Sequence, residues 1–303
     1  MTEIYSSALQ GFTESPWRLY HRELFGGVDK YYAPFMRIEH DSFRNKDIRD
    51  ILPENNEGVN LVPQIIATNA DDSRKMIEKI MEYGYREINI NFGCPYVPVC
   101  KKGMGAGMLA DAEKTKTLLD ALMQYCDEVT FSIKTRLGYL SNEDIKTILP
   151  LFNEFNPLQL TVHPRIGKQQ YNGELDLKSF EYVYENAVMP VVYNGEIFTV
   201  EDIKLIEEKY PKLKAVAVGR GLLVNPALGR EYNGGDALEI KEYLKLQKKL
   251  MNHYSEMLCG DAHIIAKLKP FWEYAPEEID RKSLKAIKKS TTFAKYRDAV
   301  GNI

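Results

Sequence analysis

Short runs of apolar and β-branched residues recur along the first two thirds of the chain, and segments with helical periodicity lie between them. The runs predict strands at 3–9, 30–36, 60–66, 87–91, 129–134, 158–162, 190–193 and 214–218. The amphipathic segments predict helices at 15–24, 71–83, 112–126, 142–155, 177–186 and 200–208, whereas 41–58 is polar and only weakly helical. Eight strands that alternate with helices predict an α/β fold, a (β/α)8 TIM barrel. A doubly wound sheet is the competing architecture, but it has no use for eight evenly spaced units.

The pattern changes after Pro226. The sequence Asn233-Gly234-Gly235 is a break typical of a linker, and no strand signal follows it. Residues 236–303 are rich in Lys, Leu, Ala and Glu, which predicts several helices. We therefore expect two domains, a catalytic barrel over 1–235 and a small all-helical domain over 236–303.

Charge and composition narrow the class of protein. The net charge of −3 hides a basic stretch, 281–297, that holds seven Lys or Arg residues and no acid. Such a stretch suits a polyanion such as nucleic acid, although a solvated surface has the same composition. No apolar run approaches the roughly 20 residues of a membrane span, and no signal peptide is visible, so we expect a cytoplasmic protein without a membrane partner. The 4 cysteines are too few for a disulfide scaffold and lack the spacing of a metal site.

The most informative stretch is 91–109, which places a thiol directly after a predicted strand. Cys94 lies in a Gly-Cys-Pro turn, and a loop with Gly103, Gly105 and Gly107 follows it. A strand end aims a side chain into a pocket, and glycines allow a backbone to lie close to a flat ligand. A lone cysteine in this place is more often a small buried apolar residue, so the thiol alone does not establish catalysis.

Polar residues follow the later predicted strands, where a barrel gathers its functional groups. They are Gln64, Asn91, Cys94, Lys134, Arg136, His163, Arg165, Tyr171, Asn194, Gly195 and Gly219-Arg220-Gly221. Cations, amides and a histidine around one rim suit a planar, electron-accepting ring with a phosphate tail. The loops after the last two strands match the phosphate site of many barrels, and Lys134 is suited to negative charge on a reduced flavin.

Several longer motifs carry a family resemblance that spans most of the chain. They are Gly11-Phe-Thr-Glu-Ser-Pro-Trp-Arg18, Phe35-Met-Arg37, Pro63-Gln-Ile65, Asn91-Phe-Gly-Cys-Pro95, Lys134-Thr-Arg-Leu-Gly138, Val162-His-Pro-Arg165, Asn194-Gly-Glu-Ile197 and Gly219-Arg-Gly221. With these motifs the sequence resembles the tRNA-dihydrouridine synthases, which are FMN enzymes built on a TIM barrel with a helical C-terminal domain. The Asn-x-Gly-Cys-Pro and Lys-x-Arg-Leu-Gly elements are the specific ones, whereas Gly-Arg-Gly occurs in many phosphate-binding barrels.

The resemblance implies roles for named residues. FMN would be held by Ala8, Leu9, Gln64, Lys134 and His163, and its phosphate by Asn194, Gly195, Gly219 and Arg220. The substrate would meet Asn91, Arg136, Arg165 and Tyr171 in the barrel, and Lys267 and Lys269 in the helical domain. Reduced FMN would pass a hydride from N5 to C6 of a uracil, and Cys94 would give a proton to C5. The thiol must then stay protonated until it is used.

The resemblance also implies partners, and several alternatives stay open. NADPH is the expected reductant, although NADH is not excluded, and the expected macromolecular partner is tRNA bound by a monomer. The same chemistry on ribosomal RNA, or an FMN barrel reductase of a small molecule, would use the same flavin site. A non-enzymatic RNA-binding module would need the basic stretch but not the convergence of Cys94, Lys134 and His163.

Overall fold

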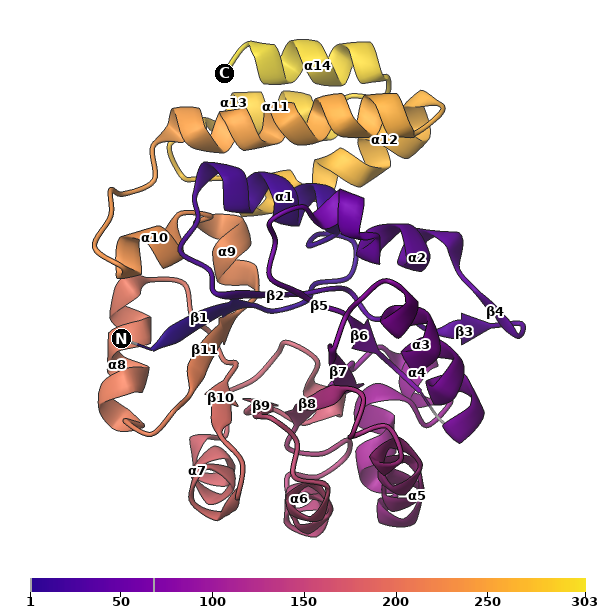
Figure 1. The fold of residues 1–303 in the computed structure, drawn as a ribbon. Helices are drawn as coiled ribbons and strands as arrows, with labels where there is room; N and C mark the ends of the chain where they lie inside the picture. The colour runs from indigo at the N-terminus through magenta and orange to yellow at the C-terminus, as the bar shows by residue number, and fades with distance from the viewer. Residues whose placement is uncertain (1, 68) are drawn as a thin grey trace.

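The computed structural model describes residues 2–67 and 69–303, and its central element is a parallel β-barrel (Figure 1). Hydrogen-bonded neighbours follow the order β5-β2-β1-β11-β10-β9-β8-β7-β6. The strands are β1 Glu3–Ser6, β2 Lys30–Tyr32, β5 Leu61–Val62, β6 Gln64–Ile65, β7 Glu87–Phe92, β8 Thr130–Arg136, β9 Leu160–His163, β10 Val191–Tyr193 and β11 Ala215–Val218. The predicted barrel and all eight strand positions are confirmed.

The barrel closes through a segment that the sequence predicts as one strand, 60–66. Pro63 divides it into β5, which pairs with β2, and β6, which pairs with β7. Proline has no N–H to give to a ladder, but its carbonyl still accepts the N–H of Asn89 at 2.9 Å. One segment thus joins the two ends of the sheet, and nine short strands fill eight barrel positions.

Helices surround the barrel close to their predicted positions. They are α1 Ser15–Leu24, α3 Ala70–Glu82, α5 Ala112–Met123, α6 Asp144–Phe155, α7 Leu177–Asn186 and α8 Val200–Lys209. Their N-termini explain the agreement, because Asn69, Asp111, Asp176 and Thr199 each cap a helix by accepting a backbone N–H. These helices bury their apolar faces against the strands, as the periodicity predicts.

The polar segment 41–58 is more structured than its sequence indicates. A small hairpin of β3 (Ile38–Glu39) and β4 (Ser42–Phe43) extends from the barrel, and α2 (Asn45–Ile51) and a 3-10 turn (Pro53–Asn56) follow it. The hydrophobic pattern did not predict this hairpin, because each of its strands has only two residues, too few to show an alternation. Two further short elements, α4 (Val97–Cys100) and a 3-10 turn over Gly105–Ala110, lie in the predicted glycine loop.

Two short helices that the sequence did not predict, α9 Arg220–Val224 and α10 Leu228–Tyr232, follow the last strand. Residues 236–303 then contain helices and no strand, as predicted: α11 Ile240–Met257, α12 Asp261–Leu268, a 3-10 turn Lys269–Tyr274, α13 Arg281–Lys289 and α14 Phe293–Gly301. Figure 1 shows α11 to α14 stacked beside α1, with α14 outermost. Lys249 of α11 pairs with Glu23 of α1 at 2.8 Å. No helix of the described chain is long and apolar enough to span a membrane.

One apolar core continues from the barrel into these helices. Trp17 on α1 and Leu250 on α11 are buried in the same cluster, and the Phe12 and Phe271 rings meet edge to face at 5.3 Å. The helical part therefore sits firmly on the β1–α1 loop and α1. The boundary at 235/236 remains a prediction, and Met1, at the start of the first predicted domain, lies outside the described residues.

Candidate active site

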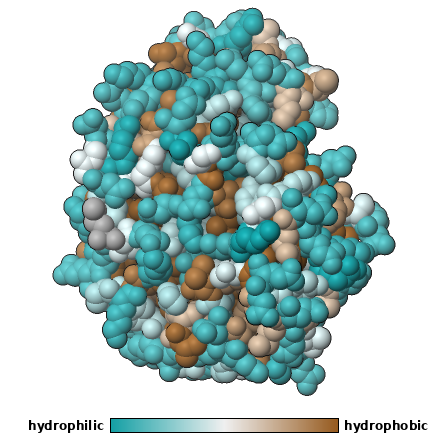
Figure 2. Space-filling view, viewed as in Figure 1, coloured by the Kyte–Doolittle hydropathy of each residue, from teal (hydrophilic) through white to brown (hydrophobic). Residues whose placement is uncertain are grey.

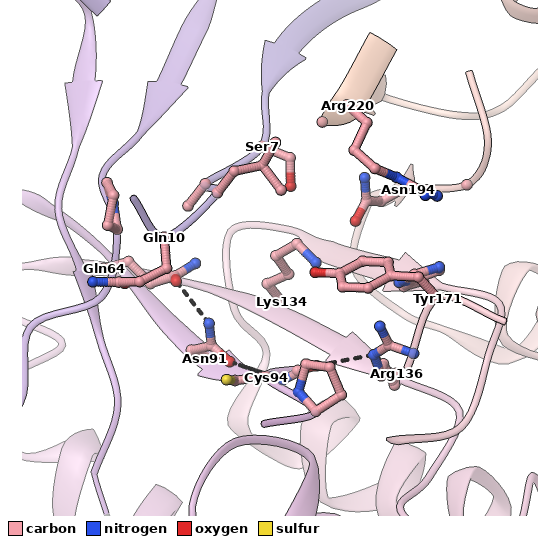
Figure 3. Close-up of a pocket in the computed structure, with 18 of the residues that line it drawn as sticks. Ser7, Gln10, Gln64, Asn91, Cys94, Lys134, Arg136, Tyr171, Asn194 and Arg220 are labelled. Atoms are coloured by element: carbon pink, nitrogen blue, oxygen red, sulfur yellow. Dashed lines mark hydrogen bonds between the residues drawn. The ribbon is translucent and has the colours of Figure 1, made fainter. Parts of the chain in front are cut away.

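A cavity of about 850 Å³ opens at the carboxyl ends of the strands, where the sequence places its polar residues (Figure 3). Its lining includes every residue predicted to hold the flavin: Ala8, Leu9, Gln64, Lys134, His163, Asn194, Gly195, Gly219 and Arg220. Cys94, Asn91, Arg136 and Tyr171 line the same cavity. Strands far apart in the sequence thus bring the candidate acid, the cations and the loops of Gly195 and Gly219 to one place.

The turn that carries Cys94 is shaped by Asn91 at the end of β7. The Asn91 Oδ1 accepts the backbone N–H groups of Gly93 at 3.0 Å and of Cys94 at 2.8 Å. Its Nδ2 donates to Gln64 Oε1 at 2.7 Å, which connects the turn to β6 (Figure 3). The Asn91 amide therefore fixes the position of the thiol from the strand below it.

The same amide belongs to a chain of buried hydrogen bonds inside the barrel. Gln64 Nε2 donates to Asn89 Oδ1 at 2.7 Å, and Asn89 Nδ2 donates to Ser132 Oγ at 2.9 Å. Gln64, Asn89 and Ser132 are each at most 1% exposed. A buried amide that has both its oxygen and its nitrogen engaged keeps one orientation. The chain therefore fixes the Gln64 side chain at the floor of the cavity.

The glycine loop does not lie against the cavity, so its predicted role as a ligand-hugging backbone is wrong. Gly105, at φ +54°, packs on the turn that carries Cys94, where an added Cβ would stand 2.8 Å from the Cys94 carbonyl oxygen. An added Cβ at Gly107 would lie 2.3 Å from the Cys100 oxygen. The glycines permit close packing behind the turn, and Ala106 N–H donates to the Cys94 carbonyl at 3.0 Å.

Burial raises the pKa of the Cys94 thiol above its ordinary value. A hydrogen bond from the Tyr96 backbone and the charges of Arg136 and Lys134 oppose this shift in pKa without cancelling it. The thiol therefore stays protonated near neutral pH, which is the state that a proton donor needs and a nucleophile lacks. This agrees with the expectation that Cys94 is not an activated thiolate.

Two cations on β8 face the cavity. Burial, with Arg136 nearby, lowers the pKa of Lys134 to about 7, and no described residue accepts a hydrogen bond from its ammonium. Arg136 is 1% exposed, and its guanidinium donates to the Gly93 carbonyl at 3.0 Å and the Ile166 carbonyl at 3.1 Å. Burial lowers the pKa of Arg136 to about 10, so the group remains charged at pH 7. Lys134 is thus the cation left for a ligand.

His163 and Tyr171 complete the rim after β9. Burial and the surrounding cations hold the pKa of His163 far below its ordinary value, so the imidazole is neutral at physiological pH. The Tyr171 ring is 46% exposed and lies between two guanidinium groups, 5.5 Å from that of Arg136 and 5.0 Å from that of Arg220. Both cations contact the ring face at cation–π distance, which holds the ring over the cavity.

The loops after β10 and β11 form the other end of the cavity. Gly195 is required by packing, because an added Cβ would stand 2.1 Å from the Tyr193 hydroxyl. A Cβ added at Gly219 would meet only Leu9, at an ordinary contact distance of 3.6 Å, so packing does not require a glycine there. The backbone N–H of Asn194 donates to the Val162 carbonyl, whereas the backbone N–H groups of Gly195 and Gly219 donate to no described residue. Arg220 stands beside them and approaches Glu196 only at 3.7 Å.

Three predicted substrate residues do not line the cavity. Arg165 is 2% exposed and donates to the Gly173 carbonyl and to Glu196, at 2.7 Å. Lys267 donates to the Gly11 carbonyl at 3.0 Å and pairs with Glu14. Lys269 donates to the carbonyls of Lys288 and Ser290 at the end of α13. The structure thus places all three in contacts within the protein, not at the cavity.

Sequence reasoning missed several residues that line the cavity, among them Ser7, Gln10, Phe35, Glu196 and Phe198. Ser7 and Gln10 follow β1, and Phe35 follows β2, so the strand-end rule applied to the first two strands would have found them. Glu196 lies beside Gly195 in a quoted motif, and no sequence signal distinguishes Phe198. Phe35 packs with Ile66 and Val99 in a small cluster that Cys94 also touches.

The residues present fit a flavin mononucleotide. Lys134 supplies an unpartnered ammonium at one end, and the unpaired N–H groups of Gly195 and Gly219 lie beside Arg220 at the other. An anionic ring edge at the first and a phosphate at the second would satisfy these donors.

Comparisons with known proteins agree with this geometry. The model of the dihydrouridine synthase family matches residues 7–275. The tRNA-dihydrouridine synthase B of Pasteurella multocida is 27% identical over 75% of this chain and 68% of its own length. The tRNA-dihydrouridine(16) synthase of Neisseria meningitidis is 25% identical over 88% of this chain and 84% of its own length.

Solved structures resemble the barrel. Morphinone reductase has a TM-score of 0.57 at 10% identity, covering 78% of this chain and 87% of its own. The old yellow enzyme of Trypanosoma cruzi has a TM-score of 0.56 at 10% identity, covering 80% and 91%. These likenesses concern the fold alone. The family match extends over nearly the whole chain, so this protein belongs to the dihydrouridine synthase family.

Proposed function

We propose that this protein reduces the C5–C6 double bond of uridines in tRNA, with Cys94 as the proton donor. The observation that carries the assignment is a thiol on a fixed turn, in the same cavity as Lys134 and the loops of Gly195 and Gly219. A flavin-dependent reductase of a conjugated double bond needs both a proton donor and a flavin site. Family membership supports the same reaction.

FMN is the flavin that we propose, because the donors at the far end of the cavity suit one terminal phosphate. Bound FMN supplies the hydride that reaches C6 of the uracil. Gly195, Gly219 and Arg220 would hold the phosphate, and Lys134 would stabilise negative charge on the ring. Gln64, fixed by Asn89 and Asn91, and neutral His163 would orient the ring by hydrogen bonds, with Ala8 and Leu9 packed against it.

The remaining residues act on the uracil. Addition of hydride at C6 places negative charge on the uracil oxygens and leaves C5 to be protonated. Arg136 keeps its charge and would stabilise those oxygens, whereas Asn91 acts mainly by holding the Cys94 turn. Tyr171 would cover the ring. The raised pKa of Cys94 keeps the thiol protonated until the negative charge develops; the basic C5 carbon then takes its proton, and solvent returns a proton to the thiolate.

We propose tRNA as the partner and residues 236–303 as the domain that binds it. The lysines of α13 are exposed and form no ion pair with a described residue, and the buried side of the helix is Ile287. Figure 2 shows that the surface at the α13 and α14 end of the molecule is mostly hydrophilic. A free basic helix suits RNA phosphates. We further propose NADPH as the reductant and a monomeric enzyme.

The direct test uses RNA from cells that lack dihydrouridine. Total RNA, the purified protein, FMN and NADPH are incubated, and dihydrouridine is mapped by position. Conversion at one or two tRNA positions is the expected result. Conversion confined to ribosomal RNA would correct the substrate. A flavin that NADPH bleaches without any RNA product would point to a small-molecule reductase, and a protein that binds no flavin would refute the proposal.

A further inference from the structure

A second, wider cavity of about 1370 Å³ adjoins the first, and we call it the outer groove. Cys94, Pro95 and Tyr171 line both cavities, so the outer groove opens from the side of the site where the thiol stands. It extends past the β3–β4 hairpin region to Tyr274 of the helical part. Any strand that carries a uracil to Cys94 must leave through such an opening.

The charged residues of the outer groove have one sign. Arg37, Arg44, Lys46 and Arg220 line it, and no carboxylate does within the described chain. Asp47 holds the Arg44 guanidinium at 2.7 and 2.8 Å, and Glu39 pairs with Arg37. Lys46 is exposed and forms no ion pair with a described residue. Arg220 approaches Glu196 at 3.7 Å. The outer groove therefore offers one cation without a carboxylate partner in the described chain, Lys46, beside three that have one.

Its most exposed aromatic residue is Tyr96, two residues after the thiol. The Tyr96 ring is 62% exposed, and no ring or cation–π contact in the described structure uses it. Its backbone is firmly held, because the Tyr96 carbonyl accepts the N–H groups of Val99 at 2.9 Å and Cys100 at 3.0 Å. An exposed ring on a rigid backbone is a stacking platform, and single-stranded RNA binds by combining such platforms with cations that meet its phosphates.

We propose that the outer groove holds a nucleotide adjacent to the target uridine, with its base stacked on Tyr96 and its phosphate beside Lys46. This inference rests on the proposed function, because it requires an RNA strand in the active site. Tyr96 and Lys46 are thus positioning residues. They hold the neighbouring nucleotide so that the flipped uracil reaches Cys94, and they compensate part of the cost of unstacking it.

The test pairs protein variants with altered RNA. Tyr96→Ala, Tyr96→Phe and Lys46→Ala are compared with the wild type and with Lys212→Ala, which removes an exposed lysine at the opposite end of the barrel. The substrate is the tRNA that the wild type reduces, either intact or with one abasic site directly 5′ or 3′ of the target. Loss of one stacked base should lower kcat/KM by roughly 5- to 100-fold.

The inference predicts a specific pattern. With intact tRNA, Tyr96→Ala lowers kcat/KM and Tyr96→Phe does not. With one of the two abasic tRNAs, the wild-type kcat/KM falls, whereas that of Tyr96→Ala falls no further. Lys46→Ala reduces the slope of log KM against log salt by about 0.7 to 0.9, whereas Lys212→Ala does not change it. Independent losses from Tyr96→Ala and from each abasic site would overturn the inference and leave the function intact.

Two other outcomes have distinct meanings. A loss confined to the rate at which NADPH bleaches the flavin would assign the outer groove to the dinucleotide and overturn the inference. A wild type that bleaches with NADPH but converts no tRNA uridine would refute the proposed function itself, and the inference with it.

Discussion

The side-chain oxygen of Asn91 accepts the backbone N–H of Cys94 at 2.8 Å, so the strand-end amide holds the thiol by its own backbone. The same amide donates to Gln64 at 2.7 Å. Asn91 thus connects Cys94, the proposed acid, to Gln64, which lies at the floor of the proposed flavin site. We therefore expect the alignment of the thiol with a bound flavin ring to depend on Asn91.

Asn91→Ala should therefore lower turnover while Cys94 is still present. The turn loses two acceptor bonds, and a misplacement of about 1 Å costs on the order of 100-fold in rate. Asn91→Asp keeps an acceptor for the Cys94 N–H and should lose less. Single-turnover oxidation of the reduced flavin by tRNA measures this. Equal losses in the two variants would show that Asn91 acts through its Nδ2 donor instead.

Gly105 tests the role of the glycine loop. In Gly105→Ala the new Cβ would stand 2.8 Å from the Cys94 carbonyl oxygen and 2.9 Å from the Cys94 Cβ, so the turn that carries Cys94 must shift. Gly84 has a similar positive φ, +86°, but open space around it, so Gly84→Ala carries the backbone strain alone. We expect both variants to lose about 1 kcal/mol of stability and only Gly105→Ala to lose turnover, by roughly 10-fold or more. Matching turnover losses would contradict the packing role.

Lys134 makes FMN binding depend on pH. Its pKa in the empty cavity is about 7, and a bound flavin whose ring carbonyl accepts a hydrogen bond from the ammonium would raise that pKa, so above pH 7 binding must take up a proton. FMN affinity should fall as pH rises from 7 to 9, by at most about tenfold per unit, while the phosphate stays doubly ionised. Fluorescence titration of the apoprotein measures it. Lys134→Met should remove the slope and Lys212→Met should keep it, whereas a slope that persists in Lys134→Met would exclude this lysine.

A comparison of Lys269 and Lys289 distinguishes a lysine that stabilises the fold from one that would bind RNA. Lys269 donates to two carbonyls at the end of α13, whereas Lys289 is exposed on that helix without an ion pair. Lys269→Met should cost about 1 kcal/mol, or about 2 °C in Tm. Lys289→Met should leave Tm unchanged and weaken tRNA binding. The opposite result, an unchanged Tm with weakened RNA binding in Lys269→Met, would return Lys269 to the RNA surface.

Hydrophobic pattern alone predicts the barrel, because parallel strands buried on both faces are continuous apolar runs that end at polar residues. It also predicts which residues meet, since the carboxyl ends of all strands lie at one rim. It does not predict where a long side chain points. Arg165 follows a strand like Arg136, yet it turns away toward Gly173 and Glu196. The prediction that the loop of Gly103, Gly105 and Gly107 lies against a ligand was wrong for a similar reason. Close packing against Cys94 and close packing against a ligand both require glycine.

The most direct measurement of the central claim is a single turnover with the flavin reduced beforehand. Wild-type protein and Cys94→Ala are reduced by NADPH, freed of excess reductant and mixed with tRNA that lacks dihydrouridine. Cys126→Ala serves as the control, because its thiol is exposed in the loop before β8, at the opposite end of the barrel. We predict rapid flavin oxidation and dihydrouridine in the wild type and Cys126→Ala, and a flavin that stays reduced in Cys94→Ala. Oxidation with product formation at the wild-type rate in Cys94→Ala would contradict the account.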